Sequence, residues 1–295
     1  MHSIVDLHLH TTASDGTDTP QQLLAHLEEL GITVFSVTDH DTDRGALELE
    51  PLVSGRKDLC FYRGIEFSCI TPVHQCHILG YLYQPDHPTF QALLAKGRAL
   101  RAAKMRRRIE VLRDRYQIVF TEEQLRWLAA QESAGKPHLA ALMTENGSVS
   151  SRAEAFDLLR QIRTPGDKID AAEAVRGILS AGGVPVWAHP LGGEGERRLT
   201  QEVFLQQLDL LCGAGIRGLE CCYSRYRAAE SAALRAAAEQ RGLLISGGSD
   251  YHGKAKDIRL GTLCREEVPV DPGTLTILDE LDRRKKAETA GETFG

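Results

Sequence analysis

Alternating polar and apolar positions at the start of the chain predict a first β-strand over residues 4–10. The aliphatic residues after Ile4 fall on one face, and His8 and His10 fall on the other. At strand spacing the two histidines lie roughly 6.5 to 7 Å apart, which suits two ligands of one metal ion. A half-exposed strand with two solvated histidines would show the same pattern, so the rest of the chain must decide.

The pattern continues as alternating strands and helices. After a polar turn, Thr19 and Pro20 predict the N-cap and the first position of a helix that Gly31 ends. We expect the next elements in this order: a strand at 33–38, a helix at 43–53, and strands at 59–68 and 75–81. A strand, a helix and a second strand in succession indicate an α/β fold.

Two of these strands carry candidate metal ligands. Glu66 lies inside the otherwise apolar strand at 59–68. Because burying a lone carboxylate is costly, it needs a positive partner, and a metal ion is the simplest one. His77 lies near the start of the following strand, whereas His74 falls in the turn before it and is a weaker candidate.

Between residues 88 and 170 the pattern changes to helices without strands. Residues 90–115 predict one long amphipathic helix, and Thr121 with Gln124 forms a capping-type start for another. We therefore expect an all-helical insertion at 98–170, with residues 1–97 and 171–295 forming the α/β domain. The basic residues of the long helix could face a polyanion or only solvent: Arg98, Arg101, Lys104, Arg106, Arg107, Arg108, Arg113 and Arg115.

Strands return after the insertion. We expect strands at 183–188, 217–221 and 243–247, and helices at 200–212, 226–241 and 277–286. The first of these strands ends in His189-Pro190, and the last runs into Gly248-Ser249-Asp250-Tyr251-His252. Polar side chains therefore follow directly where strands end.

Composition narrows the class of protein. With 295 residues, of which 42% are hydrophobic, the chain is long enough for one large α/β domain and a smaller insertion. The net charge of −6 gives no global case for a nucleic-acid or membrane partner, and no run of about eighteen apolar residues occurs. Seven cysteines without a Cys-x-x-Cys pair favour buried thiols in a reduced compartment, so we expect a cytoplasmic protein. The sequence gives no sign of an obligate protein partner.

Metal-binding side chains lie at or just past the predicted strands: His8, His10, Asp15, His40, Glu66, His77, His189, Asp250 and His252. Ligand-binding groups gather at the carboxyl ends of strands in barrels and open α/β sheets, so we expect these to converge. A catalytic zinc-type site uses about three protein ligands, so this inventory predicts two or three divalent ions. Imidazole-rich ligands without cysteine favour manganese, iron or zinc over magnesium or calcium, and manganese is our first expectation.

These motifs resemble those of the PHP (polymerase and histidinol phosphatase) family of metal-dependent phosphoesterases. The likeness rests on Asp6-Leu7-His8-Leu9-His10 with Ser14-Asp15-Gly16, Thr38-Asp39-His40, Glu66 with His77, Ala188-His189-Pro190 and Gly248-Ser249-Asp250-Tyr251-His252. It implies a distorted (β/α)7 barrel with a trinuclear metal site. By this likeness the three ions would be held by His8, His10, Glu66 and Asp250, by Glu66, His77 and His189, and by Asp15, His40 and His252.

The resemblance and metal chemistry together imply roles within this site. A metal-bridging hydroxide, held at Glu66 and Asp250, would attack phosphorus in line. Glu66 would bridge two ions, which explains a carboxylate inside an apolar strand. Asp6 and Asp39 are expected outside the ligand set, where they would orient neighbouring imidazoles through the other ring nitrogen.

The insertion carries a segment that bears on the substrate. Gly135-Lys136-Pro137-His138 resembles the Arg-Pro-His segment of the branch that contains nucleoside 3′,5′-bisphosphate phosphatases and the exoribonuclease RNase AM. By this likeness His138 would contact the substrate phosphate, although a helix-start histidine without function would look the same. Lys136 stands where arginine is usual. A guanidinium that could bind phosphate through two nitrogens is thus replaced by a single ammonium group. Arg225, just past a strand, is either a phosphate clamp or an ordinary surface arginine.

The expected function is hydrolysis of the 3′-phosphate of nucleoside 3′,5′-bisphosphates, such as adenosine 3′,5′-bisphosphate to AMP, with trimming of short RNA from its 5′ end as a second activity. Within the family, the alternatives are a cyclic-phosphate phosphodiesterase and a sugar or histidinol phosphate phosphatase. A non-catalytic PHP binding module is the alternative from another class. An amidohydrolase-like enzyme is disfavoured, because Glu66 stands where a carbamylated lysine would bridge the metals.

Overall fold

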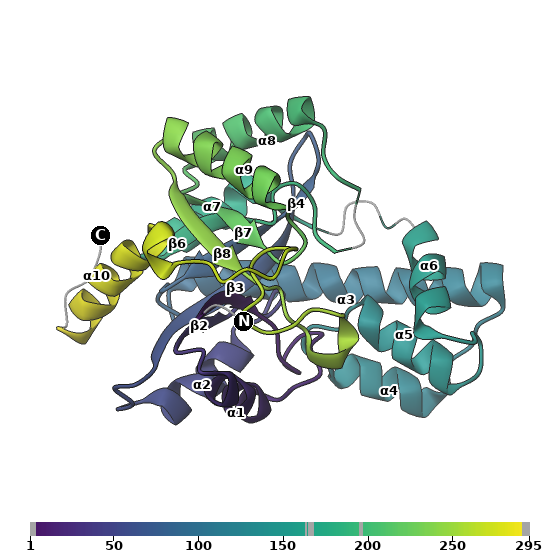
Figure 1. Ribbon diagram of the computed structural model, residues 1–295. Helices are drawn as coiled ribbons and strands as arrows, with labels where there is room; N and C mark the ends of the chain where they lie inside the picture. Colours follow the sequence, from purple (N-terminus) through teal and green to yellow (C-terminus); the bar gives the residue numbers. More distant parts are fainter. Residues whose placement is uncertain (1–3, 163, 165–167, 195–196, 291–295) are drawn as a thin grey trace.

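The computed structural model describes residues 4–162, 164, 168–194 and 197–290. Seven strands form a nearly closed, barrel-shaped sheet (Figure 1). They follow one another in the order β1 (Val5–Leu9), β2 (Val34–Val37), β3 (Cys60–Ile70), β4 (Gln75–Tyr81), β6 (Val184–Ala188), β7 (Gly218–Tyr223) and β8 (Leu244–Gly248). This confirms the predicted α/β class with a distorted seven-stranded barrel.

Strand β4 runs against its neighbours and so distorts the barrel. It pairs antiparallel with both β3 and β6, whereas the other pairs along the sheet are parallel. A short turn, with no helix, joins β3 to β4, and such a connection produces an antiparallel pair. The start of β4 therefore lies at the sheet edge where the parallel strands end. His77, near that start, pairs in register with Ser68 of β3 and Ala188 of β6.

The residues after β8 close the sheet against β1. The amide of Asp250 donates to the carbonyl of His8 at 2.9 Å, and the amide of His10 donates to the carbonyl of Tyr251 at 2.9 Å. Gly248 permits this approach, because a Cβ at that position would lie 2.3 Å from the Cβ of His8. The first and last parts of the chain therefore meet at one edge of the barrel.

Helices cover the outside of the sheet. Figure 1 shows α1 (Pro20–Leu30) and α2 (Arg44–Val53) on one side, and α7 (Ala171–Ser180), α8 (Gln201–Ala214) and α9 (Ala228–Gln240) on another. The predicted cap of α1 is confirmed, because the Thr19 side chain accepts from the Gln22 amide and Gly31 adopts a left-handed φ of 69°. The last helix, α10 (Ile277–Thr289), packs near β8. Among the residues described, every helix is too short or too polar to cross a membrane.

The helical segment in mid-chain has an apolar cluster of its own. Its helices are α3 (Pro88–Tyr116), α4 (Glu122–Ala130), α5 (Lys136–Glu145) and α6 (Arg152–Gln161). The first turns of α3 pack Phe90 and Leu93 into the barrel core, whereas Leu112 belongs to the separate cluster with α5 and α6. One continuous helix thus crosses the boundary expected at residue 98. The sequence did not predict β5 (Ile169–Asp170), which pairs with β3 and returns the chain to the sheet.

Candidate metal centre

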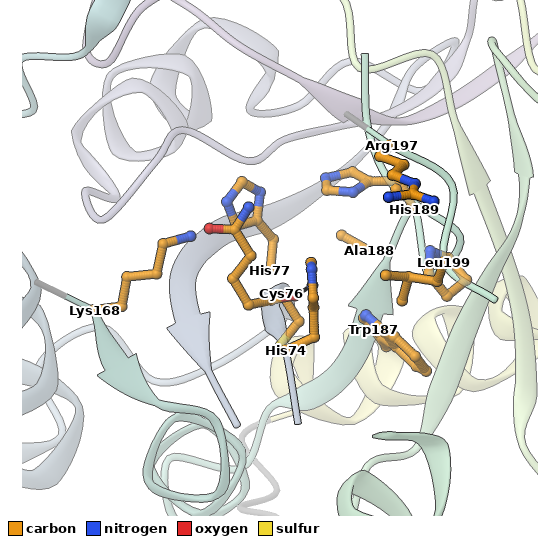
Figure 2. A pocket seen from close by; sticks show the side chains of 12 residues that line it. His74, Cys76, His77, Lys168, Trp187, Ala188, His189, Arg197 and Leu199 are labelled. Carbon is orange, nitrogen blue, oxygen red and sulfur yellow. Dashed lines mark hydrogen bonds between the residues drawn. The ribbon is translucent and has the colours of Figure 1, made fainter. Parts of the chain in front are cut away.

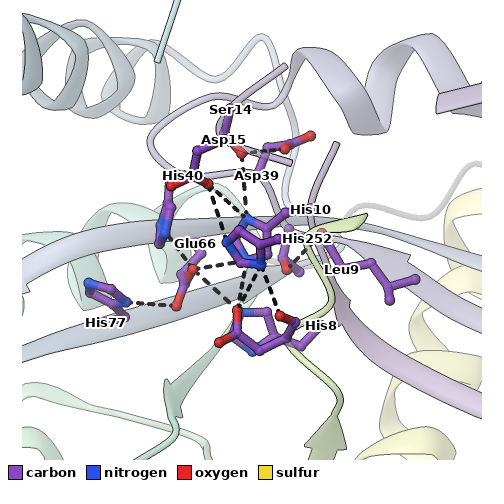
Figure 3. A network of polar contacts seen from close by, with 12 residues as sticks. His8, Leu9, His10, Ser14, Asp15, Asp39, His40, Glu66, His77 and His252 are labelled. Atoms are coloured by element: carbon purple, nitrogen blue, oxygen red, sulfur yellow. Dashed lines mark hydrogen bonds and ion pairs between the residues drawn. The ribbon is translucent and has the colours of Figure 1, made fainter. Parts of the chain in front are cut away.

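The structure brings all nine predicted ligands to one end of the barrel, and Glu66 lies between them (Figure 3). Its Oε2 is 3.4 Å from His8 Nε2, 3.3 Å from His10 Nε2 and 2.9 Å from His40 Nδ1. Its other oxygen, Oε1, is 2.9 Å from His77 Nδ1 and 3.1 Å from His189 Nε2. Each oxygen of Glu66 therefore faces a different set of imidazoles, which is the arrangement a bridging carboxylate needs.

The remaining two carboxylates lie around this centre. Asp250 Oδ1 is 3.4 Å from His10 Nε2, and Asp15 Oδ1 is 3.3 Å from His252 Nε2. Three overlapping groups have ligand atoms close enough to share an ion: His10, Asp15, His40 and His252; His8, His10 and Glu66; His40, Glu66 and His77. These groups differ slightly from those that the resemblance implied, because His10 and His40 each belong to two of them.

Unpaired buried atoms test whether a metal fits these residues. Within the described part of the chain, six ligand atoms are buried without a hydrogen-bond partner: His8 Nε2, His10 Nε2, Asp15 Oδ1, His40 Nδ1, Glu66 Oε2 and His252 Nε2. Buried polar atoms are normally paired, since leaving one unpaired costs free energy. Each of the six residues belongs to at least one of the three overlapping groups. Imidazole nitrogens and carboxylate oxygens are the ligands that divalent transition metals bind, so the site fits such ions.

The carboxylates of the centre keep their charge. Burial raises the pKa of Glu66, but the imidazoles of His40, His77 and His8 outweigh it and hold this pKa well below its usual range. Burial likewise raises the pKa of Asp250, and Lys256 and His252 together hold it well below its usual range. Both carboxylates are therefore anionic at neutral pH, as metal ligands must be.

Two ligands occupy strained backbone conformations. His189 has a φ of 29° and Asp250 a φ of 63°, in a region that residues other than glycine seldom adopt. Such conformations persist where surrounding contacts enforce them, and they cluster at functional sites. Here the amide of His189 donates to Glu220 Oε2 at 2.6 Å, and the amide of Asp250 is fixed by the strand closure described above.

The helical segment reaches the metal centre through residues 133–138. The Ser133 hydroxyl donates to the carbonyl of His40, and a Cβ on Gly135 would lie 3.0 Å from Asp15 Oδ2. His138 accepts a hydrogen bond from the amide of Gly135 at 3.0 Å through Nδ1. Burial lowers the pKa of His138, although Asp15 opposes this. The start of α5, with Lys136 and His138, is thus placed at the rim of the centre.

A small cleft opens beside two of the ligands, His77 and His189 (Figure 2). Figure 2 shows these imidazoles on the cleft wall, with the cationic side chains of Lys168 and Arg197 on either side. Trp187, which stacks on Phe204, forms part of the floor. The cleft gives an anionic molecule a path to the metal centre.

Comparison with known proteins identifies the family. No protein-family model matches the chain. A phosphoribosyl 1,2-cyclic phosphate 1,2-diphosphodiesterase of Eggerthella lenta is 31% identical over 265 residues, which cover 85% of this chain and 95% of the relative. The 5′-3′ exoribonuclease Rnm of Escherichia coli is 30% identical over 270 residues, which cover 88% of each chain. The chain belongs to the PHP family of metal-dependent phosphoesterases.

Further similarities agree with this PHP assignment. A 3′,5′-nucleoside bisphosphate phosphatase of Chromobacterium violaceum is 28% identical over 258 residues, which cover 84% of this chain and 87% of the relative. A solved structure from Bifidobacterium adolescentis, described as a metal-dependent phosphoesterase, has a TM-score of 0.78 at 27% identity and covers 95% of this chain and 96% of its own. This PHP chain is accordingly an enzyme that hydrolyses phosphate esters, not a non-catalytic binding module.

Two carboxylates of the PHP site bind the loops around it. Asp6 accepts from the amides of Ser249 and Gly261, at 2.8 and 2.9 Å, and so pins the backbone around β8. Asp39 accepts from the amide of Thr11 at 2.8 Å and from the Ser14 hydroxyl at 2.5 Å. Both thus bind backbone or hydroxyl groups of the surrounding loops, and the Ser14 hydroxyl that contacts Asp39 lies 3.4 Å from His10 Nδ1. That Asp6 and Asp39 orient imidazoles stays a prediction.

Glu220 orients a metal-binding imidazole, the role expected of Asp6 and Asp39, although it was not among the predicted site residues. This fully buried residue of β7 lies 2.9 Å from His8 Nδ1 through Oε1, which leaves His8 Nε2 free to face the metal centre. A contact to the second ring nitrogen fixes the orientation of a metal-binding histidine. The signal was present, because Glu220, like Glu66, is a lone carboxylate inside an apolar strand.

Two other residues support Asp250 and were also missed. The Tyr223 hydroxyl donates to Asp250 Oδ2 at 3.0 Å, and Lys256 Nζ donates to the same oxygen at 2.7 Å. Both leave Oδ1 to face His10. Tyr223 lies at the end of β7, two residues past the strand expected at 217–221. Lys256 lies in a loop that no local pattern distinguishes.

The proposed clamp Arg225 is engaged elsewhere in this structure. Its Nη2 donates to Glu194 Oε1 at 2.5 Å and to the carbonyl of Asp257 at 2.6 Å. These contacts would have to open before the guanidinium could bind a phosphate. The role of Arg225 as a clamp therefore stays a prediction.

Proposed function

We propose that this enzyme removes the 3′-phosphate from nucleoside 3′,5′-bisphosphates. The observation that carries the proposal is the position of the α5 start, with Lys136 and His138, at the rim of a metal centre whose ligand atoms lack partners. A nucleotide with two phosphates suits this arrangement, because one phosphate would meet the metals while positive charge beside the centre would attract the other. The similarity to a 3′,5′-nucleoside bisphosphate phosphatase supports the same substrate class.

In this proposal the nine ligands hold two or three divalent ions, with manganese expected first and iron or zinc as alternatives. When bound, such ions supply Lewis acidity that activates water near neutral pH and offset charge on the phosphoryl oxygens. Glu66 and Asp250 contribute the negative charge that keeps the ions together. Lys136 and His138 bind the phosphate of the substrate from the side of α5, and Glu220 keeps His8 in its binding orientation.

A substrate panel tests this proposal. The protein, supplied with manganese, is assayed with adenosine 3′,5′-bisphosphate, a ribose cyclic phosphate and histidinol phosphate. We expect the highest kcat/KM for the bisphosphate. A higher kcat/KM for either of the other two compounds would replace the proposal by one of the alternatives within the family.

Trimming of short RNA from the 5′ end is a second candidate activity. Three curated relatives are named as 5′-3′ exoribonucleases, including that of Escherichia coli. On the surface of α3, Arg107 and Arg115 have exposed side chains whose positive charge suits an RNA backbone. Charge reversal at these two residues should weaken turnover of a short 5′-phosphorylated RNA and leave mononucleotide turnover intact. Equal turnover of RNA by wild type and variant would remove this role for α3.

A further inference from the structure

Three cationic side chains of α3 share the face that points toward the metal centre. Arg101, Lys104 and Arg108 follow at intervals of three and four residues, which places them on one side of a helix. Arg101 donates to Asp41 Oδ2 and to the Ser68 hydroxyl, each at 2.9 Å. Asp41 directly follows one metal ligand in the chain, and Ser68 pairs with another across β3 and β4. These three residues form a cationic stripe along α3, and the stripe begins beside the metal centre.

Within residues 4–162, 164, 168–194 and 197–290, Lys104 of this stripe makes no ion pair. Burial is the main cause that lowers its pKa, to about 6, and the charged groups that add most to this effect are all cations: Lys168, Arg108, Arg101 and Lys136. They come from α3 itself, from the start of α5 and from the segment that leads into β5. Cationic side chains from three parts of the chain thus surround the partly buried Lys104.

Arg108 is the most buried member of the stripe. It is 7% exposed, and among the residues described its Nε has no hydrogen-bond partner. Burial, with a contribution from Arg101, lowers its pKa to about 10. A buried guanidinium nitrogen without a partner costs stability.

Another buried arginine shows how this fold pairs a guanidinium that has a structural role. Arg63 is 8% exposed, and it binds Glu50 at 2.5 Å, Glu288 at 2.7 Å and the carbonyl of Tyr83 at 3.0 Å. Two carboxylates and a carbonyl therefore satisfy it. Among the described residues, Arg108 is as buried as Arg63 and Lys104 is partly buried, and neither has a carboxylate partner. A group that is costly to the fold is commonly kept for function.

We propose that Lys104 and Arg108 form a subsite for the second phosphate of the substrate, the 5′-phosphate of a nucleoside 3′,5′-bisphosphate. The inference rests on the proposed function and adds the residues that distinguish this substrate from a nucleoside 3′-phosphate. A phosphate seated there supplies the missing counter-charge, and Arg108 offers it the fork geometry that suits phosphate oxygens. Arg101 is held by Asp41 and Ser68 and fixes the end of the stripe nearest the metals.

The test compares two substrates that differ only in the 5′-phosphate: adenosine 3′,5′-bisphosphate and adenosine 3′-phosphate. The variants are Lys104→Met and Arg108→Met, and the matched control is Arg106→Met, an exposed residue of the same helix. We expect either variant to lower kcat/KM for the bisphosphate about 10- to 100-fold, as for loss of a hydrogen bond to a charged group, mainly through KM. Turnover of adenosine 3′-phosphate should stay within about twofold of the wild type, and the control should change neither substrate.

Binding of adenosine 5′-phosphate, measured as competitive inhibition, gives a second readout that does not depend on cleavage of a bisphosphate. Its inhibition constant should rise by the same factor in Lys104→Met and stay unchanged in Arg106→Met. Thermal melts identify a variant that fails to fold, and in that case the other variant decides.

The outcomes separate this inference from the proposed function. If the wild type prefers the bisphosphate but Lys104→Met and Arg108→Met keep that preference, the subsite is wrong and the proposed function stands. If both substrates slow equally, the stripe acts on the metal centre or the fold, which also overturns the subsite. If the wild type cleaves neither nucleotide but hydrolyses another member of the substrate panel, the proposed function itself fails.

Discussion

At the scale of single residues, Glu66 and Glu220 show what a lone buried carboxylate means. Both interrupt apolar strands, and both contact imidazoles of the metal centre. From the sequence one could predict that each needs a partner. Glu66 lies beside His8 Nε2, on the side of the metal centre, and Glu220 lies beside the other ring nitrogen, Nδ1. This difference depends on how β3 and β7 are placed around His8, which no local sequence pattern reveals.

Replacing Glu220 by glutamine tests its role in positioning His8. The amide keeps the size of the side chain but removes the charge that fixes the imidazole, so we expect metal affinity to fall about 10- to 100-fold, as for other outer contacts of metal ligands. Calorimetric titration with manganese measures this loss. Excess manganese should restore kcat if the residue acts only on metal binding. Unchanged manganese affinity in a folded Glu220→Gln protein would contradict the role.

Lys104 also predicts a pH-dependent stability difference. Its pKa is about 6 in the folded protein and near 10.5 when exposed, so folding disfavours the charged form. This penalty is small at high pH, grows as the pH falls from about 10 and levels off below about 6. Replacing Lys104 by methionine should therefore raise the urea midpoint more at pH 6.5 than at pH 9.5. The charged groups that face Lys104 are Arg101, Arg108, Lys136 and Lys168, and of these Arg108, with a pKa of about 10, begins to lose its charge near pH 9.5 in the wild type and the variant alike.

The control for this measurement is Arg106→Met, whose difference from the wild type should be the same at both pH values. A stabilisation by Lys104→Met that grows with pH, or a destabilisation at pH 6.5, would show that Lys104 has a counter-charge in the folded protein.

At the scale of elements, most of the fold follows from local patterns. The seven strands of the barrel and the helices that cover it lie close to the predicted ranges, because period-two and helical patterns with caps and glycine stops fix them locally. The missed strand β5 has only two residues, too few for any pattern. The sequence analysis grouped the basic residues of α3 together, but the helical period separates them. The neighbours Arg106, Arg107 and Arg108 point in different directions, and of these three only Arg108 is buried.

The closure of β8 against β1 gives a prediction about packing. Gly248→Ala places a Cβ 2.3 Å from the Cβ of His8, so we expect a loss of about 1 to 3 kcal/mol in the free energy of unfolding, and a disturbed metal centre. The matched control is Gly213→Ala in α8, where an added Cβ meets nothing within 4 Å. Because alanine favours a helix, the control should be neutral or more stable. Equal urea midpoints for Gly248→Ala and the wild type would contradict the close packing.

At the scale of the whole molecule, the barrel edge gathers side chains from both ends of the chain. The nine candidate ligands could be named from the sequence, because each lies within a strand or in a segment that follows one. It did not predict how α3 and α5 meet the centre, since docking of the helical segment depends on contacts such as that of Ser133 with the carbonyl of His40. The net charge of −6 likewise conceals the cations that gather around Lys104.

The number of manganese ions that the protein binds per chain tests the metal centre most directly. The protein is stripped with a chelator, titrated with manganese and analysed for bound metal, alongside His8→Ala and the control His74→Ala at an exposed histidine outside the ligand set. We predict two or three ions for the wild type and the control, and at least one fewer for His8→Ala. Fewer than two ions in the saturated wild type, or a full complement in His8→Ala, would contradict a centre built from these nine side chains.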